Sequence, residues 1–400
     1  MLFYTIDQPQ PASDGWLVSD WKLWWQKNVW SPENVQPDDA GGVKLVLDEG
    51  PEGYRGAEIQ SDAMLTTGTL RWDARVADLP SGGVAGLFAF QAHGAPRWEF
   101  DFEWVGRKGL REAQISVHAY DPNLGRIVSA GISFPLGFDA SAGVHRYEIV
   151  LTGQEAAMLV DGRPVYYFAP EDLGGFWSRA SVKSFASTFA GGNPYWSGVW
   201  NGLPDGAVAT YLAGAEVKPG HVPFRVLQGG ASADSFHGGS ASEVLRGRSG
   251  NDSLSGWRGN DLLRGQDGND RLYGNQGQDT LKGGRGADHL DGGSGHNWLS
   301  GASGADTFVI SQGKSTITDF ESKDTLQFND AAFGADLHEG WLRPWQFAIN
   351  QARDSTDHFV FRTSDATLWF DNNGHDRGGR TLLADLQDGA ALAAADILII

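Results

Sequence analysis

A glycine-led repeat of nine residues constrains this chain more than any other feature. It begins at Gly229 and runs to Val309 without an insertion, so nine units in succession fill 81 residues. Position 1 of every unit is glycine, position 6 is an acid in all units except the one with Asn297, and position 8 is always Leu or Phe. A flexible linker is the alternative, but a linker would not keep an apolar residue in register nine times. The period therefore predicts a solenoid of stacked units.

The residue types of the repeat indicate a metal-binding β-roll. Glycine permits the positive φ that tight turns require, and the apolar residue at position 8 is expected to point inward from a short strand. Carboxylates at position 6, together with turn carbonyls, supply the hard oxygen ligands that Ca²⁺ prefers. Without metal this row of like charges would repel, so we expect the roll to fold only when several calcium ions are bound. The predicted ligands are the aspartates at position 6, and the pattern is kept best from Asp252 to Asp288: Asp234, Asp252, Asp261, Asp270, Asp279, Asp288 and Asp306.

The repeat resembles the RTX calcium-binding consensus. The residues after Val309 resemble the C-terminal cap and export signal of RTX proteins carried by type I secretion. This second resemblance rests on Asp319, Phe320 and Asp324, on residues 371–374, and on the acidic-then-aliphatic end. It implies the type I secretion machinery as a partner, and export of an unfolded chain that folds on meeting calcium. A capping β domain with no export role is the alternative.

Charge and composition restrict the partners. The chain has 50 acidic and 31 basic residues, a formal charge of −19, which argues against nucleic acid or an anionic membrane surface as a partner. It has no cysteine, so calcium would replace disulfides as the stabilising cross-link. We find no basic and apolar leader at the N-terminus and no apolar run of about 18 residues. We therefore expect an extracellular monomer without a cleaved signal peptide and without a membrane span.

The first 220 residues have a different composition. They contain many aromatic residues and short alternating runs but no long segment of helical period, which indicates a β-sandwich or jelly roll. The composition changes near Lys218. We therefore predict an all-β chain with a jelly roll over residues 1–220, a calcium-bound parallel β-roll over 221–310 and a C-terminal β cap over 311–400.

One predicted strand, residues 98–104, carries catalytic chemistry. Its strict alternation places Glu99, Asp101 and Glu103 on one face and four aromatic residues on the other. Four residues at ~3.3 Å each put the outer Cα atoms about 13 Å apart, and inward-reaching side chains leave a carboxyl gap of roughly 5–7 Å. That gap overlaps the ~5–5.5 Å of retaining glycosidases and the lower edge of inverting ones, so we favour retention. A solvated outer face is the alternative, but three adjacent like charges without Lys or Arg are unfavourable there.

This strand resembles the E-x-D-x-E motif of glycoside hydrolase family 16, in its unbulged, lichenase-like form. Segments that resemble the family extend over about 200 residues and include 55–61, 136–147, 160–162 and 195–202. The resemblance implies a curved jelly roll with Glu99 as nucleophile and Glu103 as general acid/base. Asp101 would orient Glu99 and hold the two titrations apart.

The same resemblance implies a set of sugar-binding residues. Core packing is the alternative for each tryptophan. Lichenases carry a cleft tryptophan two residues before the nucleophile, whereas Trp98 immediately precedes Glu99, and alternation predicts that Trp98 faces the core. The implied substrate-binding residues are Glu58, Trp196 and Trp200.

The sequence leads to one preferred function and two rivals. We expect a secreted endo-β-glycanase whose polysaccharide substrate is a β-glucan or a bacterial exopolysaccharide. A non-catalytic matrix or adhesion protein is the main rival, although a lectin has no use for three adjacent carboxylates. Direct participation of calcium in catalysis is disfavoured, because the predicted ligands lie more than a hundred residues from the carboxylate strand.

Overall fold

The computed structural model places β structure throughout the part of the chain that it describes. That part comprises residues 10–13, 16–19, 28–39, 41–51, 53–91, 98–106, 110–152, 155–177, 180–191, 200, 202–203, 206–311, 313–329, 337–353, 356–371, 380–387 and 389–400. The chain divides into two compact units, residues 1–222 and 223–400. Within the described residues the only helices are short 3₁₀ turns, and none could cross a membrane. The predicted all-β class is confirmed.

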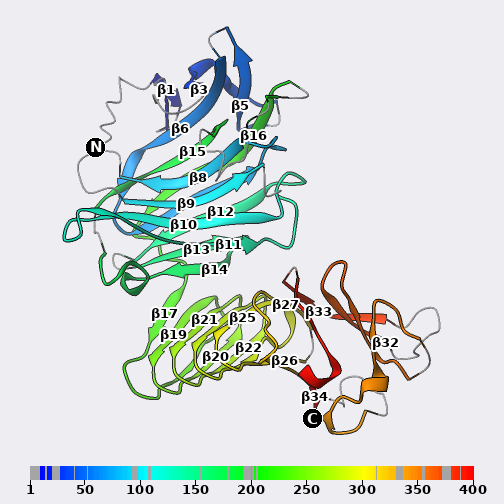
Figure 1. Ribbon diagram of the computed structural model, residues 1–400. Coiled ribbons are helices and arrows are strands. Elements are labelled where there is room, and N and C mark those ends of the chain that lie inside the picture. Colours follow the sequence, from blue (N-terminus) through cyan, green and yellow to red (C-terminus); the bar gives the residue numbers. More distant parts are fainter. Residues whose placement is uncertain are drawn as a thin grey trace. The chain divides into compact units, whose positions relative to one another are not determined.

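Unit 1 is a sandwich of two antiparallel layers that are joined at one edge. The first layer has the strand order β11-β10-β9-β8-β15-β6 and the second continues as β5-β16-β7-β12-β13-β14 (Figure 1). The short strands β1 to β4 pair at the margin with β2, β5 or β6, and η1 (Pro32–Asn34) and η2 (Pro170–Leu173) are 3₁₀ turns. The strands are β1 (Gln10–Ser13), β2 (Trp16–Val18), β3 (Asn28–Trp30), β4 (Val35–Pro37), β5 (Val43–Gly50), β6 (Gly53–Leu65), β7 (Gly68–Arg75), β8 (Gly83–Phe90), β9 (Trp98–Val105), β10 (Glu112–Asp121), β11 (Arg126–Pro135), β12 (His145–Leu151), β13 (Ala156–Val160), β14 (Arg163–Phe168), β15 (Val182–Ala190) and β16 (Val208–Pro219).

Aromatic side chains fill the space between these layers. Phe102 and Trp104 on β9 contact Tyr147 on β12 with ring centroids 5.6 and 4.8 Å apart. Farther along, Phe100 lies 6.5 Å from Phe168 on β14. Since large rings in edge-to-face contact contribute most of the energy of such a core, β9 is fixed from its inner side.

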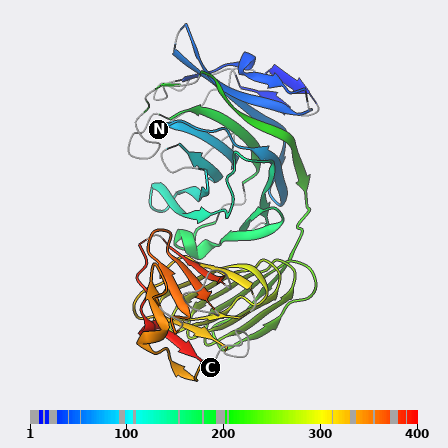
Figure 2. The ribbon, with the colours of Figure 1, turned by 90° about the vertical axis from the view of Figure 1, so that its right-hand side faces the viewer.

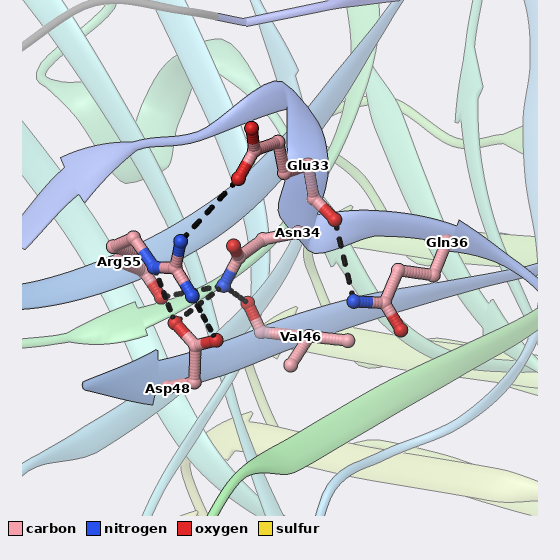
Figure 3. Close-up of polar contacts among 6 residues, drawn as sticks. All are labelled: Glu33, Asn34, Gln36, Val46, Asp48 and Arg55. Carbon is pink, nitrogen blue, oxygen red and sulfur yellow. Dashed lines mark hydrogen bonds and ion pairs between the residues drawn. The ribbon is translucent and has the colours of Figure 1, made fainter. Parts of the chain in front are cut away.

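A polar cluster fastens the corner where the two layers meet (Figure 3). Arg55 on β6 donates two hydrogen bonds to Asp48 on β5, from Nε at 2.9 Å and from Nη2 at 2.6 Å. Asn34 is 1% exposed, and its amide donates to Asp48 and to the carbonyls of Val46 and Arg55 at 2.9 to 3.1 Å. A bidentate guanidinium–carboxylate pair fixes direction as well as distance, so the cluster holds β5 and β6 in register.

Unit 2 begins as a parallel solenoid with two repeats in each coil. Strands alternate between two sheets, and residue i pairs with residue i+18 in the next coil (Figure 1). One sheet has the order β17-β19-β21-β23-β25-β27-β33-β32-β31-β30 and the other β18-β20-β22-β24-β26-β28-β34-β29. The coil strands are β17 (Arg225–Gln228), β18 (Ser235–His237), β19 (Glu243–Ser249), β20 (Ser253–Arg258), β21 (Leu262–Asp267), β22 (Arg271–Gln276), β23 (Thr280–Arg285), β24 (His289–Asp291), β25 (Gly295–Ser303), β26 (Thr307–Ile310), β27 (Gly313–Ile317) and β28 (Thr325–Phe328).

The parallel coils extend beyond the last glycine-led repeat. Ile317 and Leu326 take the inward position below Leu299 and Phe308, eighteen residues on. The cap strands β33 and β34 then pair in parallel with β27 and β28, so that Leu386 and Ile397 continue the two apolar ladders. One hydrophobic core therefore runs from Leu245 to Ile399 through the roll and the cap. The remaining elements are β29 (Gly340–Trp341), η4 (Pro344–Gln346), β30 (Phe347–Ile349), β31 (Phe359–Arg362), β32 (Thr367–Asp371), β33 (Arg380–Leu386), η5 (Ala394–Asp396) and β34 (Ile397–Ile399).

Candidate functional site

The carboxylate strand β9 lies inside the first layer, between β8 and β10 (Figures 1 and 2). Its aromatic face is closed, since Trp98, Phe100, Phe102 and Trp104 are at most 2% exposed. Trp98 packs edge-on against Trp177 with ring centroids 4.8 Å apart, so its predicted inward position is confirmed. The strand's other face presents three carboxylates in a row. Glu99 and Glu103 are half-buried, and Asp101 between them is 2% exposed.

Asp101 is held by side chains of the neighbouring strand. The register pairs Asp101 with Ser116 and Glu99 with His118 on β10. Ser116 Oγ donates to Asp101 Oδ2 at 3.2 Å, and His118 Nε2 lies 3.6 Å from the same oxygen. The other ring nitrogen of His118 is 2.7 Å from Ser129 Oγ on β11. The central carboxylate is therefore positioned by β10, while the outer two keep part of their surface accessible.

Glu58 lies on the same cross-strand row as Glu103. The register runs from Glu58 on β6 to Ser187 on β15, Gly86 on β8 and Glu103 on β9. Three strand spacings at ~4.8 Å separate the two glutamates by about 14 Å. A Cβ on Gly86, between them in the row, would lie 3.3 Å from Phe88 and from Ser187 Oγ, so the sheet surface is closely packed at this position. Glu58 itself is 3% exposed and accepts a hydrogen bond from Ser19 Oγ at 2.7 Å, and its sugar-binding role stays a prediction.

Trp200 is the one of the two tryptophans predicted to bind substrate that lies in the described part of the chain. Trp200 is 9% exposed and packs with Leu47 and Ala190. Its ring lies edge-on to Tyr54 at 4.8 Å. This burial favours the core-packing alternative for Trp200. Trp196 lies outside the described residues, and a sugar-stacking role for either residue stays a prediction.

The aspartates of the roll form a second candidate site, repeated from coil to coil. Oδ1 of each aspartate accepts a hydrogen bond from the main-chain N–H of the residue eighteen positions earlier, at 2.7 to 3.0 Å. This ladder starts with Asp252 and continues past the repeats to Asp324. Asp234 belongs to the first coil, and its Oδ2 accepts from the Gly230 N–H at 2.7 Å. The second oxygen, Oδ2, is buried without a hydrogen-bond partner in Asp252, Asp261, Asp270, Asp288 and Asp306.

Burial of these aspartates disfavours their ionised form. Burial raises the pKa of Asp261 to about 8, of Asp288 to about 7 and of Asp270 to about 6. Carboxylates of adjacent coils add to the effect in each case. A buried, unpartnered anionic oxygen is costly unless a proton or a cation satisfies it. The repeated site therefore has the character of a cation site.

The glycine at position 1 leaves room for this oxygen. A Cβ on Gly265 would lie 2.0 Å from Asp270 Oδ2, and one on Gly247 would lie 2.0 Å from Asp252 Oδ2. Positive φ occurs at the position-4 glycines, as in Gly268 at +133°, and not at the position-1 glycines. Position 2 also has positive φ although it holds Arg248, Trp257, Gln266, Asn275 and Ala302.

The donor set fits calcium if main-chain carbonyls complete it. Within the described part of the chain no three His, Cys, Asp or Glu side chains come together as a ligand set. Each coil therefore offers separate carboxylate oxygens next to turns whose conformation is repeated. Mixed carboxylate and carbonyl oxygen is a normal ligand set for Ca²⁺ and a poor one for softer metals.

Two residues of the candidate active site were missed by sequence reasoning. Ser116 and His118 contact Asp101 from β10, fifteen or more residues along the chain. An alternating strand at 112–121 with polar residues at every second position could have suggested an exposed face, but not which residue faces which. Strand register supplies that information.

Family models match both units. The model described as Glycosyl hydrolases family 16 matches residues 24–201. The model described as RTX calcium-binding nonapeptide repeat (4 copies) matches residues 226–254, 237–272 and 273–308. No curated protein matches the chain.

Solved structures similar to this chain include three of glycan-cleaving enzymes. The Bacillus licheniformis beta-glucanase is 20% identical, with 52% of this chain and 94% of that chain covered and a TM-score of 0.45. A prokaryotic beta-1,3-1,4-glucanase (lichenase) derived from a mouse hindgut metagenome is 23% identical, with 53% and 96% covered and a TM-score of 0.45. A structure described as a native glycosidic hydrolase is 22% identical, with 52% and 92% covered and a TM-score of 0.45.

Proposed function

Residues 24–201 are a glycosyl hydrolase family 16 domain and residues 226–308 carry RTX calcium-binding repeats, and from this premise we propose that the protein is a retaining endo-β-glycanase. Its substrate is a β-glucan or a bacterial exopolysaccharide. The observation that carries the proposal is the face of β9, where two half-buried glutamates flank one buried aspartate. Most glycoside hydrolases use a pair of carboxyl groups that flank the scissile bond.

In the proposed mechanism Glu99 is the nucleophile, and Glu103 acts first as general acid and then as general base. A carboxylate oxygen of Glu99 attacks the anomeric carbon while protonated Glu103 gives its proton to the departing glycosidic oxygen. Glu103, now a carboxylate, takes a proton from water, and the resulting hydroxide attacks the same carbon and releases Glu99. Two inversions give net retention.

Asp101 is the positioning residue of this scheme. It lies between the glutamates, and the hydrogen bond from Ser116 Oγ at 3.2 Å fixes its carboxyl group. His118 Nε2 lies 3.6 Å from the same carboxyl oxygen, so two side chains of β10 hold Asp101 in place.

Calcium has a structural role in the proposal. When bound, it supplies positive charge beside the buried Oδ2 atoms, and thereby stabilises the folded roll. The residues that would hold it are Asp234, Asp252, Asp261, Asp270, Asp279, Asp288 and Asp306, with main-chain carbonyls of the adjacent turns.

Secretion and location follow from the repeats as part of the same proposal. A roll that needs calcium at the ~10⁻⁴–10⁻³ M of extracellular modules would stay unfolded in a low-calcium cytosol. We therefore place the working protein outside the cell, exported by type I secretion machinery, as a monomer that has no nucleic-acid partner.

The test is release of reducing ends from mixed-linkage β-glucan, laminarin, xyloglucan and purified bacterial exopolysaccharides, with calcium present. Wild type should release reducing ends from at least one polymer, and Glu99→Gln should lose activity by a factor on the order of 10³ or more. Glu112→Gln, on β10 and hydrogen-bonded to Ser133, is the matched control and should keep activity. Polymer binding without release, equal in wild type and Glu99→Gln, would instead support the non-catalytic matrix protein.

A further inference from the structure

The roll carries a groove on its surface that is separate from the aspartate ladder. It has a volume of about 460 Å³ and is lined in part by residues of β20 and β22, two strands that are labelled in Figure 1. Trp257, Asn275 and Gly293, at position 2 of alternate repeats, line it together with Ser311, which follows Gly293 by eighteen residues. Its volume is within the ~300–1,000 Å³ of small-molecule sites.

The groove follows the axis of the roll because its lining residues are neighbours in a parallel ladder. Trp257 pairs with Asn275, Arg258 with Gln276, and Gln276 with Ser294. Adjacent strands are ~4.8 Å apart, so the row from Trp257 to Ser311 covers three strand spacings, about 14 Å. That length accommodates more than one ring of an extended polymer.

Trp257 closes one end of the groove and is the residue that requires an explanation. Its side chain is 57% exposed, although burying an indole is ordinarily favourable. Its φ of +77° is positive like that of the other non-glycine residues at position 2, so this backbone conformation is a property of the coil. The exposed indole beside a groove is the feature that indicates contact with something outside the chain.

Beyond Asn275 and Gln276, the groove is lined by residues with small side chains or none. Gly293 has φ +74°, and a Cβ on it would lie 2.2 Å from the carbonyl oxygen of Asn275, so close packing of the adjacent coils excludes a side chain here. Ser294 and Ser311 next to it are small, so no side chain fills the space that follows the indole.

The polar groups of the groove suit hydroxyls. Asn275 Nδ2 donates to Ser255 Oγ at 3.0 Å and to the Tyr273 carbonyl at 3.1 Å. These bonds use both hydrogens of the Asn275 amide, so its side-chain oxygen can accept a hydrogen bond from a ligand. Gln276 and Arg258 are exposed and provide further amide and guanidinium donors. Arg258 is the one charged side chain in the groove's described lining.

We propose that this groove is a glycan-binding site, in which a pyranose ring stacks on Trp257 while Arg258, Asn275 and Gln276 bind its hydroxyls. An apolar ring face beside convergent amides matches a sugar better than a peptide or a lipid, because a sugar has both a flat C–H face and a hydroxyl edge. The identity of the glycan rests on the proposed function: it is the polymer that unit 1 cleaves. The glycan is either neutral or carries carboxyl groups, and Arg258 would recognise the latter bidentately.

The test measures binding in the full-length Glu99→Gln protein with calcium, so that polymer is not consumed. The probes are mixed-linkage β-glucan and the same glucan after carboxymethylation, and Kd is measured by affinity electrophoresis. Trp257→Asn should weaken binding on the order of tenfold, and asparagine tolerates the positive φ, as Asn275 does in the next coil. Trp345→Ala, which removes an equally exposed indole (59%) elsewhere in unit 2, should change Kd by less than a factor of about two.

Two outcomes would overturn the proposal: no measurable binding of either probe, or equal Kd values for Glu99→Gln with and without Trp257→Asn. Circular dichroism in calcium would establish that the Trp257→Asn roll is folded. Arg258→Gln distinguishes an acidic from a neutral glycan. If the natural glycan is acidic, this variant should weaken binding of the carboxymethylated probe alone. If it is neutral, the variant should change the Kd of both probes equally.

Failure of this proposal is distinguishable from failure of the proposed function. Hydrolysis of short soluble oligosaccharides by protein with intact Glu99 tests unit 1 alone, and Trp257→Asn should leave it unchanged. If Trp257→Asn loses polymer binding but protein with intact Glu99 hydrolyses no substrate, the groove proposal stands and the glycanase proposal is wrong.

Discussion

At the scale of single residues, the roll depends on a carboxylate that occupies the space a side chain would need. A Cβ added to Gly265 would lie 2.0 Å from the Oδ2 atom of Asp270, which is too close for two unbonded atoms. The same holds for Gly247 with Asp252, Gly256 with Asp261, Gly283 with Asp288 and Gly301 with Asp306, at 2.0 to 2.3 Å. Glycine at position 1 is therefore a requirement of close packing against an acid.

Gly265→Ala should move the Asp270 carboxylate and weaken calcium-dependent folding by about 1–3 kcal/mol, the usual cost of overpacking. The measurement is a calcium titration followed by circular dichroism, in which the midpoint should rise. Gly230→Ala is the control, because its nearest neighbour would be Asp234 Oδ2 at 4.0 Å. A midpoint equal in both variants would contradict this account.

Ser116→Ala should lower kcat with little change in KM. It removes the 3.2 Å hydrogen bond to a carboxylate that is 2% exposed, and a hydrogen bond to a charged group is worth about 1.5–3 kcal/mol, so a loss of roughly tenfold is expected. Ser133→Ala, on β11 in contact with Glu112 at the strand's start, is the matched control. The measurement is steady-state kinetics on the polymer that wild type hydrolyses fastest. An equal kcat for Ser116→Ala and Ser133→Ala would contradict the positioning role of Ser116.

Residue types were easier to predict than their contacts. Alternation alone placed Glu99, Asp101 and Glu103 on one face, because side-chain direction in a strand follows from local geometry. It could not find Ser116 and His118, because their proximity depends on the register of β9 with β10. Positive φ at Trp257 was likewise invisible, since sequence signals for that conformation are glycine and asparagine, and here stacking of coils imposes it.

At the scale of elements, the β5–β6 corner determines how the two layers of unit 1 are joined (Figure 3). Burial disfavours the ionised form of Asp48, but hydrogen bonds from Arg55 and Asn34 and the charge of Arg55 outweigh it, so the pKa of Asp48 lies below its usual value. A lowered native pKa means that the contribution to stability is complete above the unfolded pKa of about 3.9 and is lost as pH falls through the native pKa.

Asp48→Asn should therefore lower the free energy of unfolding of unit 1 at pH 7 by about 0.5–1 kcal/mol, the upper range for a solvent-screened pair. The difference from wild type should shrink as pH falls below about 4. Urea unfolding at pH 7 and pH 3 measures it. Glu33→Gln is the control, since Glu33 is 83% exposed and its contact with Arg55 is 3.4 Å long; a pH-independent difference for Asp48→Asn would contradict the assignment.

The limits of the roll were less predictable than its existence. The repeats end at Val309, yet the parallel coils continue to β28 and take up β33 and β34 from the cap. What persists there is the apolar ladder and the hydrogen bond that the Asp306 N–H donates to Asp324 at 3.0 Å, while the glycine at position 1 does not persist. A prediction based on glycine spacing therefore gives a roll that is one coil too short.

At the scale of the whole molecule, the two units have separate cores. Unit 2 contains buried aspartates whose Oδ2 atoms have no hydrogen-bond partner, whereas the buried carboxylates Glu58 and Asp101 of unit 1 accept hydrogen bonds from serine hydroxyls. The responses of the two units to calcium should therefore differ.

Chelation of calcium should unfold residues 223–400 and leave residues 1–222 folded. Circular dichroism should lose part of the strand signal, and limited proteolysis should leave a fragment that ends near Val222. Hydrolysis of short soluble substrates should persist in that state. A single transition in which both units unfold together, or an unchanged spectrum, would contradict the prediction, and excess magnesium added with the chelator serves as the control for ionic strength.

The register of eighteen residues gives the roll a parity. Each nine-residue unit belongs to the sheet opposite its neighbour. The cap pairs with β27 and β28, so it moves with the last coils when units are lost. Deletion of residues 274–291 should shorten the roll by one coil, keep every later strand in its sheet and leave a cooperative thermal transition in calcium. Deletion of 274–282 should move every later strand, together with the cap, to the opposite side of the roll. Such a protein can change its length over evolution or by design and keep its cap on the same side only in even steps.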